Sequence, residues 1–190
     1  MGDGIRMKTK RWFLYFVIYS MLGWCYEVFL EVVVYRWGFS NRGFLWGPYC
    51  PVYGFGALAF LLCLNRLKEK QVRCKLPFLQ KSVNLTPLFV FVGIILIATG
   101  IELVASYLLE YTTGGWLWDY RSYGFHFQGR IALNPSLRFG LGGMVIMYLL
   151  HPALKRVFEP REDAQINRYF WVAAIAMGAD VVIRIAGLVL

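Results

Sequence analysis

Five ionisable side chains interrupt segments of the sequence that are otherwise almost wholly apolar. A charge at the centre of a membrane-spanning helix costs roughly 2.5–3.5 kcal/mol on insertion scales. A chain keeps such residues when they pair with one another or when they handle a proton or an ion. They are therefore the first candidates for a functional site, and they are Glu27, Glu102, Arg138, Asp180 and Arg184.

Their depth can be estimated, because an α-helix rises about 1.5 Å per residue. Glu27 and Glu102 each lie roughly 5 Å outward of the middle of their apolar runs, and Arg138 lies about 6 Å outward. Asp180 is near the middle of its run, and Arg184 is one turn further out. The five groups thus lie at similar depth on four different helices.

These groups are three acids and two arginines, so if they pair, one acid is left without a counter-charge. Asp180 and Arg184 are spaced i, i+4 and can pair along one helix face. Arg138 can then meet Glu27 or Glu102, and one acid remains. A carboxylate without a counter-charge in an apolar medium tends to keep its proton, as in many coupled transporters. The alternative is a fully paired ion network that locks the helices together, and the sequence leaves both open.

Two connecting segments, 36–50 and 111–131, are rich in glycine and aromatic residues. Tryptophan and tyrosine at this depth commonly form an interfacial belt. Glycine and proline at this density also suit irregular backbone that dips into a protein-lined cavity. On the second interpretation the outer entrance to the site is shaped by Asn41, Arg42, Tyr49, Tyr53, Asp119 and Arg130.

The same segments support an enzymatic alternative. Asp119 would be a general acid or base and Arg130 an anion clamp, with Arg42 opposite them, acting on a lipid-linked or phosphate-bearing amphiphile at the outer leaflet. The simpler interpretation is that Asp119 and Arg121 form a salt bridge within the loop. No recognised catalytic or nucleotide-binding motif occurs in the sequence, so a protein that is not an enzyme is the simpler interpretation.

The composition points to a membrane protein. Of the 190 residues 58% are hydrophobic and only 16% are charged, with a mean hydropathy of +0.52, whereas soluble domains have about 25% charged residues. The net charge of +9 does not indicate nucleic-acid binding, because the bases lie in short clusters beside apolar runs. The four cysteines and two histidines show no metal-binding spacing, and we expect no cofactor.

Five apolar runs predict an all-α bundle of about five transmembrane helices, forming a single domain over residues 1–190. The run at 50–65 is short for a span, since about 20 residues are needed. With the N-terminus in the cytoplasm, 14 of the 20 Lys and Arg residues lie on the cytoplasmic side, which favours this orientation. The runs are 12–36, 50–65, 87–110, 132–152 and 169–190.

Small residues predict close helix packing. Gly23 is four residues before Glu27, and Ser136 is four residues before Gly140, spacings that allow neighbouring backbones to approach. We expect Glu31 and Glu110, near the outer interface, to be solvated. Each half also has an acid-bearing helix, an aromatic glycine-rich loop and a return helix, a weak indication of an internal repeat.

The block Asn41-Arg-Gly-Phe-Leu-Trp-Gly-Pro-Tyr-Cys-Pro-Val-Tyr-Gly54 resembles the signature of a family of bacterial integral membrane proteins, described as putative ABC-transporter type IV or CmpB-like permease. The resemblance continues at Gly23–Glu27, Trp118–Tyr120, Gly129–Ile131 and His151-Pro152. Gln128 and Ala132 depart from the Asn and Cys of the family pattern.

The resemblance implies a polytopic protein of the bacterial plasma membrane and a permease-like role in transport. Such a short bundle rarely encloses a pathway alone, so we expect a homo-oligomer or a partner membrane subunit, surrounding lipids and a separate ATPase as partners. Glu27 and Glu102 would handle a proton or a cation, with Arg138, Asp180 and Arg184 around them. A non-catalytic role in membrane-protein assembly is the remaining alternative.

Overall fold

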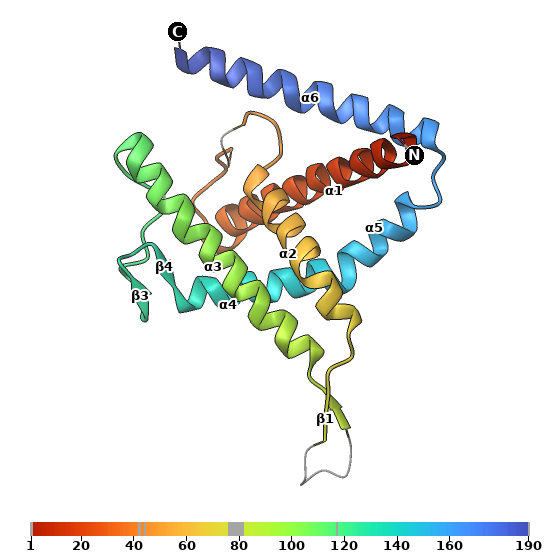
Figure 1. The fold of residues 1–190 in the computed structure, drawn as a ribbon. Helices are drawn as coiled ribbons and strands as arrows, with labels where there is room; N and C mark the ends of the chain where they lie inside the picture. Colours follow the sequence, from red (N-terminus) through yellow and green to blue (C-terminus); the bar gives the residue numbers. More distant parts are fainter. Residues whose placement is uncertain (1, 42, 44, 76–81, 117, 190) are drawn as a thin grey trace. The chain divides into compact units, whose positions relative to one another are not determined.

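The computed structural model describes residues 2–41, 43, 45–75, 82–116 and 118–189. Its regular structure is almost wholly helical, and the all-α prediction is confirmed (Figure 1). The two π-helical segments η1 (Leu30–Val34) and η2 (Ile146–Leu150) continue α1 and α4. The α-helices are α1 (Gly2–Phe29), α2 (Pro51–Glu69), α3 (Thr86–Thr113), α4 (Leu133–Val145), α5 (His151–Phe158) and α6 (Asp163–Val189).

Within the described residues, four helical segments are long and apolar enough to cross a membrane, so the chain is a multi-pass membrane protein. They are Arg6–Val34, Thr86–Thr112, Leu133–Phe158 and Asp163–Gly187. The predicted run at 50–65 forms α2, whose 19 residues end in a polar turn with Arg66, Lys68 and Glu69. α2 is thus a helix, but it is not one of the four.

The chain divides into two compact units, which are described separately. The terminal unit comprises Met1–Leu58 and Ala153–Leu190, and the central unit comprises Ala59–Pro152. The boundaries fall inside α2 and α5.

In the terminal unit α1 packs against α6. Phe13 and Phe170 meet edge to face with their ring centroids 5.2 Å apart, a favoured aromatic geometry. Arg11 donates to the backbone carbonyls of Phe158, Glu159 and Arg161. These carbonyls lie at and just after the C-terminus of α5, where the helix leaves carbonyl groups without helical donors, so the guanidinium helps to satisfy them.

Gly54 allows the start of α2 to approach α1 closely. A Cβ atom at this position would lie 2.6 Å from the Phe16 ring and 2.7 Å from the Phe16 carbonyl oxygen. Nearby, the Ser20 hydroxyl donates to that carbonyl at 2.8 Å and the Cys50 amide donates to the Ser20 carbonyl at 2.9 Å. The absence of a side chain at residue 54 therefore fixes how the family-like block meets the first span.

In the central unit α4 packs against α3 through its small residues. A Cβ atom on Gly140 would lie 2.6 Å from Phe91 and 2.8 Å from Ile95. One turn earlier, the Thr99 hydroxyl donates to Ser136 at 2.7 Å. The small-residue face predicted from Ser136 and Gly140 is thus a packing surface.

The π-helical turn η2 has a cause in the sequence. The His151 amide bonds to the Ile146 carbonyl, and Pro152 has no amide hydrogen to give to Met147. Lys68 supplies the missing donor, since its ammonium bonds to the Met147 carbonyl at 2.6 Å and lies 5.0 Å from the Tyr148 ring centroid. A lysine at the end of α2 thus stabilises a distorted turn in the return helix.

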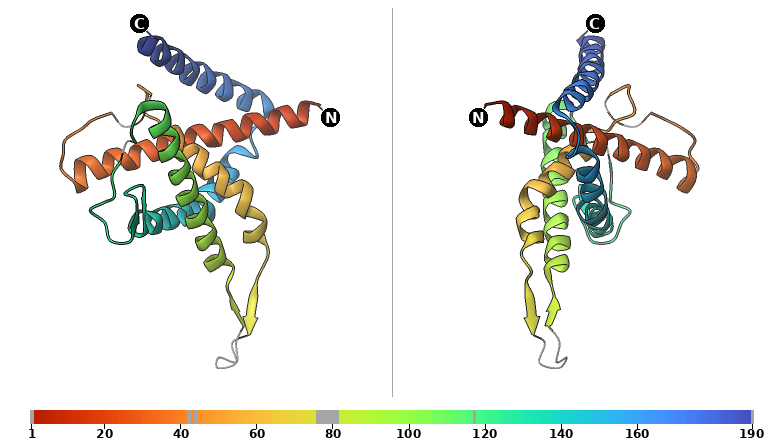
Figure 2. Two further views of the ribbon diagram at one scale, coloured as in Figure 1. Left: turned by 60° about the vertical axis from the view of Figure 1, so that its left-hand side comes forward. Right: turned by 90° about the vertical axis from the view of Figure 1, so that its right-hand side faces the viewer.

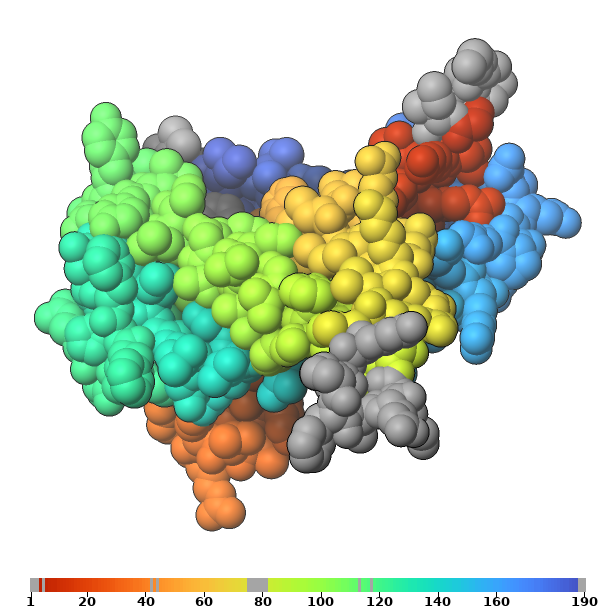
Figure 3. Space-filling view, turned by 60° about the horizontal axis from the view of Figure 1, so that its bottom comes forward, coloured from red at the N-terminus to blue at the C-terminus, as the bar shows by residue number. Residues whose placement is uncertain are grey.

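Short strands complete the central unit. β1 (Arg73–Lys75) pairs antiparallel with β2 (Ser82–Asn84), and β3 (His126–Phe127) pairs antiparallel with β4 (Ile131–Ala132). Figure 2 shows the first hairpin continuing from the ends of α2 and α3. The surface of these two helices, yellow to green in Figure 3, includes exposed apolar residues, as expected of helices that face lipid: Leu62, Leu88, Phe89, Val92 and Leu96.

Candidate functional site

Each of the three acids predicted at membrane depth accepts a hydrogen bond from a tyrosine hydroxyl. Tyr53 donates to Glu27 and Tyr49 donates to Asp180 in the terminal unit. Tyr120 donates to Glu102 in the central unit. Each of these tyrosines lies in, or directly after, one of the glycine- and aromatic-rich segments. Tyr49 and Tyr120 therefore connect loops to the acids, and Tyr53 does so from the first turn of α2. The sequence analysis placed Tyr49 and Tyr53 at the outer entrance but did not predict these bonds to the acids.

Asp180 has a complete set of donors. Its Oδ1 accepts the backbone amide of Trp46 at 3.1 Å. Its Oδ2 accepts the amide of Gly47 at 2.7 Å and the Tyr49 hydroxyl at 2.8 Å. The side chain is only 9% exposed, and hydrogen bonds to an ionised carboxylate are among the strong ones in proteins. Asp180 therefore anchors the loop before α2 to the last span.

Tyr49 remains a donor over the whole physiological range. Burial raises its pKa to about 12, and its hydrogen bond to Asp180 adds to the shift. Arg184, one turn beyond Asp180, is close enough to interact with it electrostatically. Its guanidinium lies 5.1 Å from the Trp46 ring centroid, so the same loop residue that bonds to Asp180 also packs against this arginine.

Asn41, predicted at the outer entrance, holds the loop itself. Its amide donates to the carbonyls of Leu45 at 3.2 Å and Trp46 at 2.9 Å. Its carbonyl oxygen accepts the indole hydrogen of Trp24 at 2.8 Å. Arg42, the neighbouring entrance residue of the prediction, lies outside the described residues.

Glu31 is buried, contrary to the expectation that it is solvated. The residue is 5% exposed, and its carboxylate accepts the Ser40 hydroxyl at 2.7 Å and the Ser40 amide at 3.3 Å. It lies in η1, where the wider π-helical turn changes the direction of the side chains. These two hydrogen bonds hold Ser40, the residue before Asn41, against the end of the first span.

Glu102 is satisfied on one side only. Its Oε1 accepts the Tyr120 hydroxyl at 2.7 Å. Its Oε2 is buried and has no hydrogen-bond partner among the described residues. An unsatisfied buried acceptor costs roughly 1–3 kcal/mol, and more when it is charged. This oxygen is therefore the atom of the three acids that most needs a proton, a cation or a water molecule.

Arg130 contacts Ser106, one helical turn beyond Glu102, and lies in an aromatic cage formed by Tyr107 of α3 and Trp116 of the loop. Its guanidinium carbon is 4.1 Å from the ring centroids of both Tyr107 and Trp116. The guanidinium donates to Glu110 and lies 3.4 Å from the Ser106 hydroxyl. The residue is 5% exposed, and cation–π contacts are strongest when desolvated.

The polar face of α3 explains this arrangement. Glu102, Ser106 and Glu110 are spaced four residues apart and share one side of the helix. The loop covers this side with Tyr120 and Arg130. The sequence contained this signal as a repeat of polar residues in a highly apolar run, but the loop partners could not be predicted from spacing.

Asp119 has a different environment from the catalytic role considered for it. It is exposed, and it pairs with Arg121 at 3.3 Å. Gly129, at φ +72°, comes close to both residues, because a Cβ atom there would lie 2.8 Å from each. This is the loop salt bridge of the simpler interpretation.

Arg138 lies on α4 in the central unit and is exposed. Glu27 belongs to the terminal unit, so the meeting of ionisable groups from all four helices stays a prediction. The described residues contain no cluster of three or more histidine, cysteine or acidic side chains suited to a metal ion.

Comparison with known proteins identifies the family of this chain. Neither the comparison with curated proteins nor that with solved structures found a match. A family model described as putative ABC-transporter type IV matches residues 14–185, nearly the whole chain. The matched region contains both glycine- and aromatic-rich segments, the three acids with their tyrosine donors, and the Arg130 cage. The chain belongs to the family described as putative ABC-transporter type IV.

Proposed function

We propose that the protein is a membrane transport component, a permease-like subunit in which Glu102 carries a proton or a cation. The observation that supports this is the buried Oε2 of Glu102, which has no partner among the described residues. The family description supports the transport class. A carboxylate in a membrane span is costly to keep unless it is paired or used.

Tyr120 fixes the orientation of Glu102 without neutralising it. A phenol donates to either the ionised or the protonated acid, so the contact at 2.7 Å can persist while the second oxygen gains or loses a proton. The nearby Arg130 already pairs with Glu110, which leaves Glu102 free of a direct ion pair in the described part of the chain. Such an acid can change its charge without dismantling the loop.

The other predicted residues receive supporting roles in this proposal. Glu27, Arg138, Asp180 and Arg184 would form the surrounding polar network. The outer entrance would be shaped by Asn41, Arg42, Tyr49, Tyr53, Asp119 and Arg130. The enzymatic alternative gains no support from the described geometry, because Asp119 faces Arg121 and Arg130 is enclosed by rings.

Ion movement through the full chain tests this proposal. Proteoliposomes containing a pH-sensitive dye are given a potassium diffusion potential, with parallel vesicles containing a sodium-sensitive dye. We expect flux of protons or sodium ions above that of empty vesicles, and its loss in Glu102→Gln. Glu69→Gln, which removes an exposed acid of the same unit at the end of α2, is the matched control. Equal flux from wild type and Glu102→Gln would exclude Glu102 as the carrier.

Partners are tested separately. We propose a homo-oligomer or a second membrane subunit in the bacterial plasma membrane, coupled to an ATPase. Native mass spectrometry of the protein extracted in mild detergent would then show a stoichiometric complex. A monomer without a stoichiometric protein partner would contradict this part of the proposal and leave the Glu102 test unaffected.

A further inference from the structure

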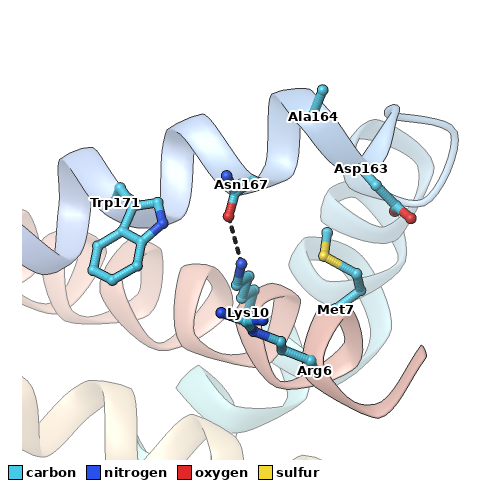
Figure 4. Close-up of a pocket in the computed structure, with 7 residues that line it drawn as sticks. All are labelled: Arg6, Met7, Lys10, Asp163, Ala164, Asn167 and Trp171. Atoms are coloured by element: carbon cyan, nitrogen blue, oxygen red, sulfur yellow. Dashed lines mark hydrogen bonds between the residues drawn. The ribbon is translucent and has the colours of Figure 1, made fainter. Parts of the chain in front are cut away.

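A cavity of about 580 Å³ lies between the first turns of α1 and α6, both in the terminal unit. Figure 4 shows Arg6 and Lys10 on one side and Asn167 and Trp171 on the other. The Lys10 ammonium donates to the Asn167 side chain. None of these four residues belongs to the site proposed for transport.

The cavity carries positive charge that the described residues do not neutralise. Arg6 and Lys10 are four residues apart, so two like charges share one face of α1, which is unfavourable without an anion. Lys10 is only 8% exposed, and its direct partner Asn167 is neutral. Asp163 is the acid among the described lining residues, and its exposed carboxylate pairs with Arg11 at 3.4 Å.

The backbone adds to this charge. The helix dipole places partial positive charge at the first turns of α6, where the Gln165 and Ile166 amides already donate to the Glu162 carbonyl. Asp163 and Asn167 both lie in these first turns. The cavity thus combines two side-chain cations with the end of a helix that favours anions.

Its depth indicates the source of the anion. The candidate spans Arg6–Val34 and Asp163–Gly187 both begin at this cavity. The end of a span lies at the level of the lipid headgroups, where tryptophan is enriched, and Trp171 lines the cavity. Basic pockets between spans at this level suit phospholipid headgroups.

We propose that this cavity binds the phosphate of an anionic phospholipid headgroup, with Arg6 and Lys10 as its cationic contacts. Asn167 holds the Lys10 ammonium at the cavity, and Trp171 packs at the interfacial level. The site is independent of the proposed transport function, because it shares no residue with Glu102 or its loop.

The test uses the full chain in nanodiscs of phosphatidylcholine with a minor share of phosphatidylglycerol. After transfer to detergent, native mass spectrometry counts the phosphatidylglycerol molecules that remain bound. We expect Arg6→Gln with Lys10→Gln to weaken retention about fivefold for each charge removed. Lys8→Gln, which removes an exposed charge of the same helix that does not line the cavity, should leave retention unchanged.

A second variant protects the test against misfolding. Asn167→Asp has the same shape and should pair with Lys10, so the fold is kept while the net charge of the cavity falls by one unit. We expect this variant to lose phosphatidylglycerol at an unchanged unfolding temperature. Full retention in Asn167→Asp or in the double variant, or an equal loss in Lys8→Gln, would overturn the site. Release of the lipid by excess inorganic phosphate alone would overturn the headgroup assignment and indicate a site for free anions.

Discussion

The terminal and central units each attach a glycine-rich loop to an acid in a membrane span, but they do so to different degrees. Asp180 in the terminal unit accepts two backbone amides and the Tyr49 hydroxyl. Glu102 in the central unit accepts the Tyr120 hydroxyl on one oxygen, while its other oxygen is buried without a partner among the described residues. The same kind of contact thus produces one saturated and one half-saturated carboxylate.

The difference separates a structural acid from a reactive one. A carboxylate with three donors is stabilised in its charged form and has little capacity left for a ligand. A carboxylate with one free buried oxygen costs free energy that a proton or a cation can recover. Asp180 is therefore expected to matter for folding and Glu102 for function.

The largest expected effect is that of Asp180→Ala. The substitution leaves the amides of Trp46 and Gly47 and the Tyr49 hydroxyl without their acceptor, and we expect a loss of about 3 kcal/mol or more in the free energy of unfolding. Thermal unfolding in detergent would measure it. Glu162→Gln, an exposed acid near the start of α6, is the control. An unfolding temperature equal to wild type would remove the distinction between the two acids.

The close contact of α1 and α2 in the terminal unit predicts the next effect. Gly54→Ala places a methyl group against the Phe16 ring and backbone, and overpacking of this kind costs roughly 1–3 kcal/mol. Gly56→Ala, two residues along the same helix, meets nothing within 4 Å. It should be neutral or slightly stabilising. Similar unfolding temperatures for both variants would show that α1 and α2 are not closely packed at Gly54.

Arg130→Lys tests the cage in the central unit. Lysine keeps the positive charge but loses the flat guanidinium between Tyr107 and Trp116, so we expect a loss of about 1–2 kcal/mol in unfolding free energy. Arg121→Lys changes an exposed arginine of the same loop and should have almost no effect. Equal unfolding free energies for the two variants would show that the Tyr107 and Trp116 rings do not stabilise the Arg130 guanidinium.

The sequence predicted the helices well because long apolar runs leave few alternatives. It also located the five charges inside those runs. It did not predict how the acids are satisfied, since the spacing of Asp180 and Arg184 favoured a pair along one helix. Beside its electrostatic interaction with Arg184, Asp180 has donors from Trp46 and Gly47, which are backbone amides and have no signature in residue type.

The burial of Glu31 shows the same limit. Its place near the end of a span suggested solvent, but the π-helical turn and Ser40 enclose it. Tyr120 belongs to the family-like Trp118–Tyr120 block and could have been selected as a candidate residue. Its partner could not be predicted, because Glu102 lies 18 residues earlier on a helix. Contacts between a loop and a helix depend on the loop path, which periodicity does not describe.

The smallest effect on stability is expected for Glu102→Gln. Glutamine keeps a carbonyl oxygen for Tyr120 and exchanges the unpartnered carboxylate oxygen for a neutral amide NH2 at the same place, so the unfolding free energy should change by less than about 1 kcal/mol. Asp180→Asn should cost more, since a neutral amide weakens three hydrogen bonds. Equal losses in thermal unfolding would contradict the contrast between the two sites.

Carbodiimide labelling compares the two acids directly. A hydrophobic carbodiimide adds to a protonated carboxylic acid in an apolar site and leaves a stable acylurea, which peptide mass spectrometry can locate. The folded wild-type protein, treated near neutral pH, should carry the label at Glu102 and not at Asp180, and Glu102→Gln should lose it. Labelling of Asp180 with Glu102 unmodified would contradict the assignment of Glu102 as the proton-carrying acid.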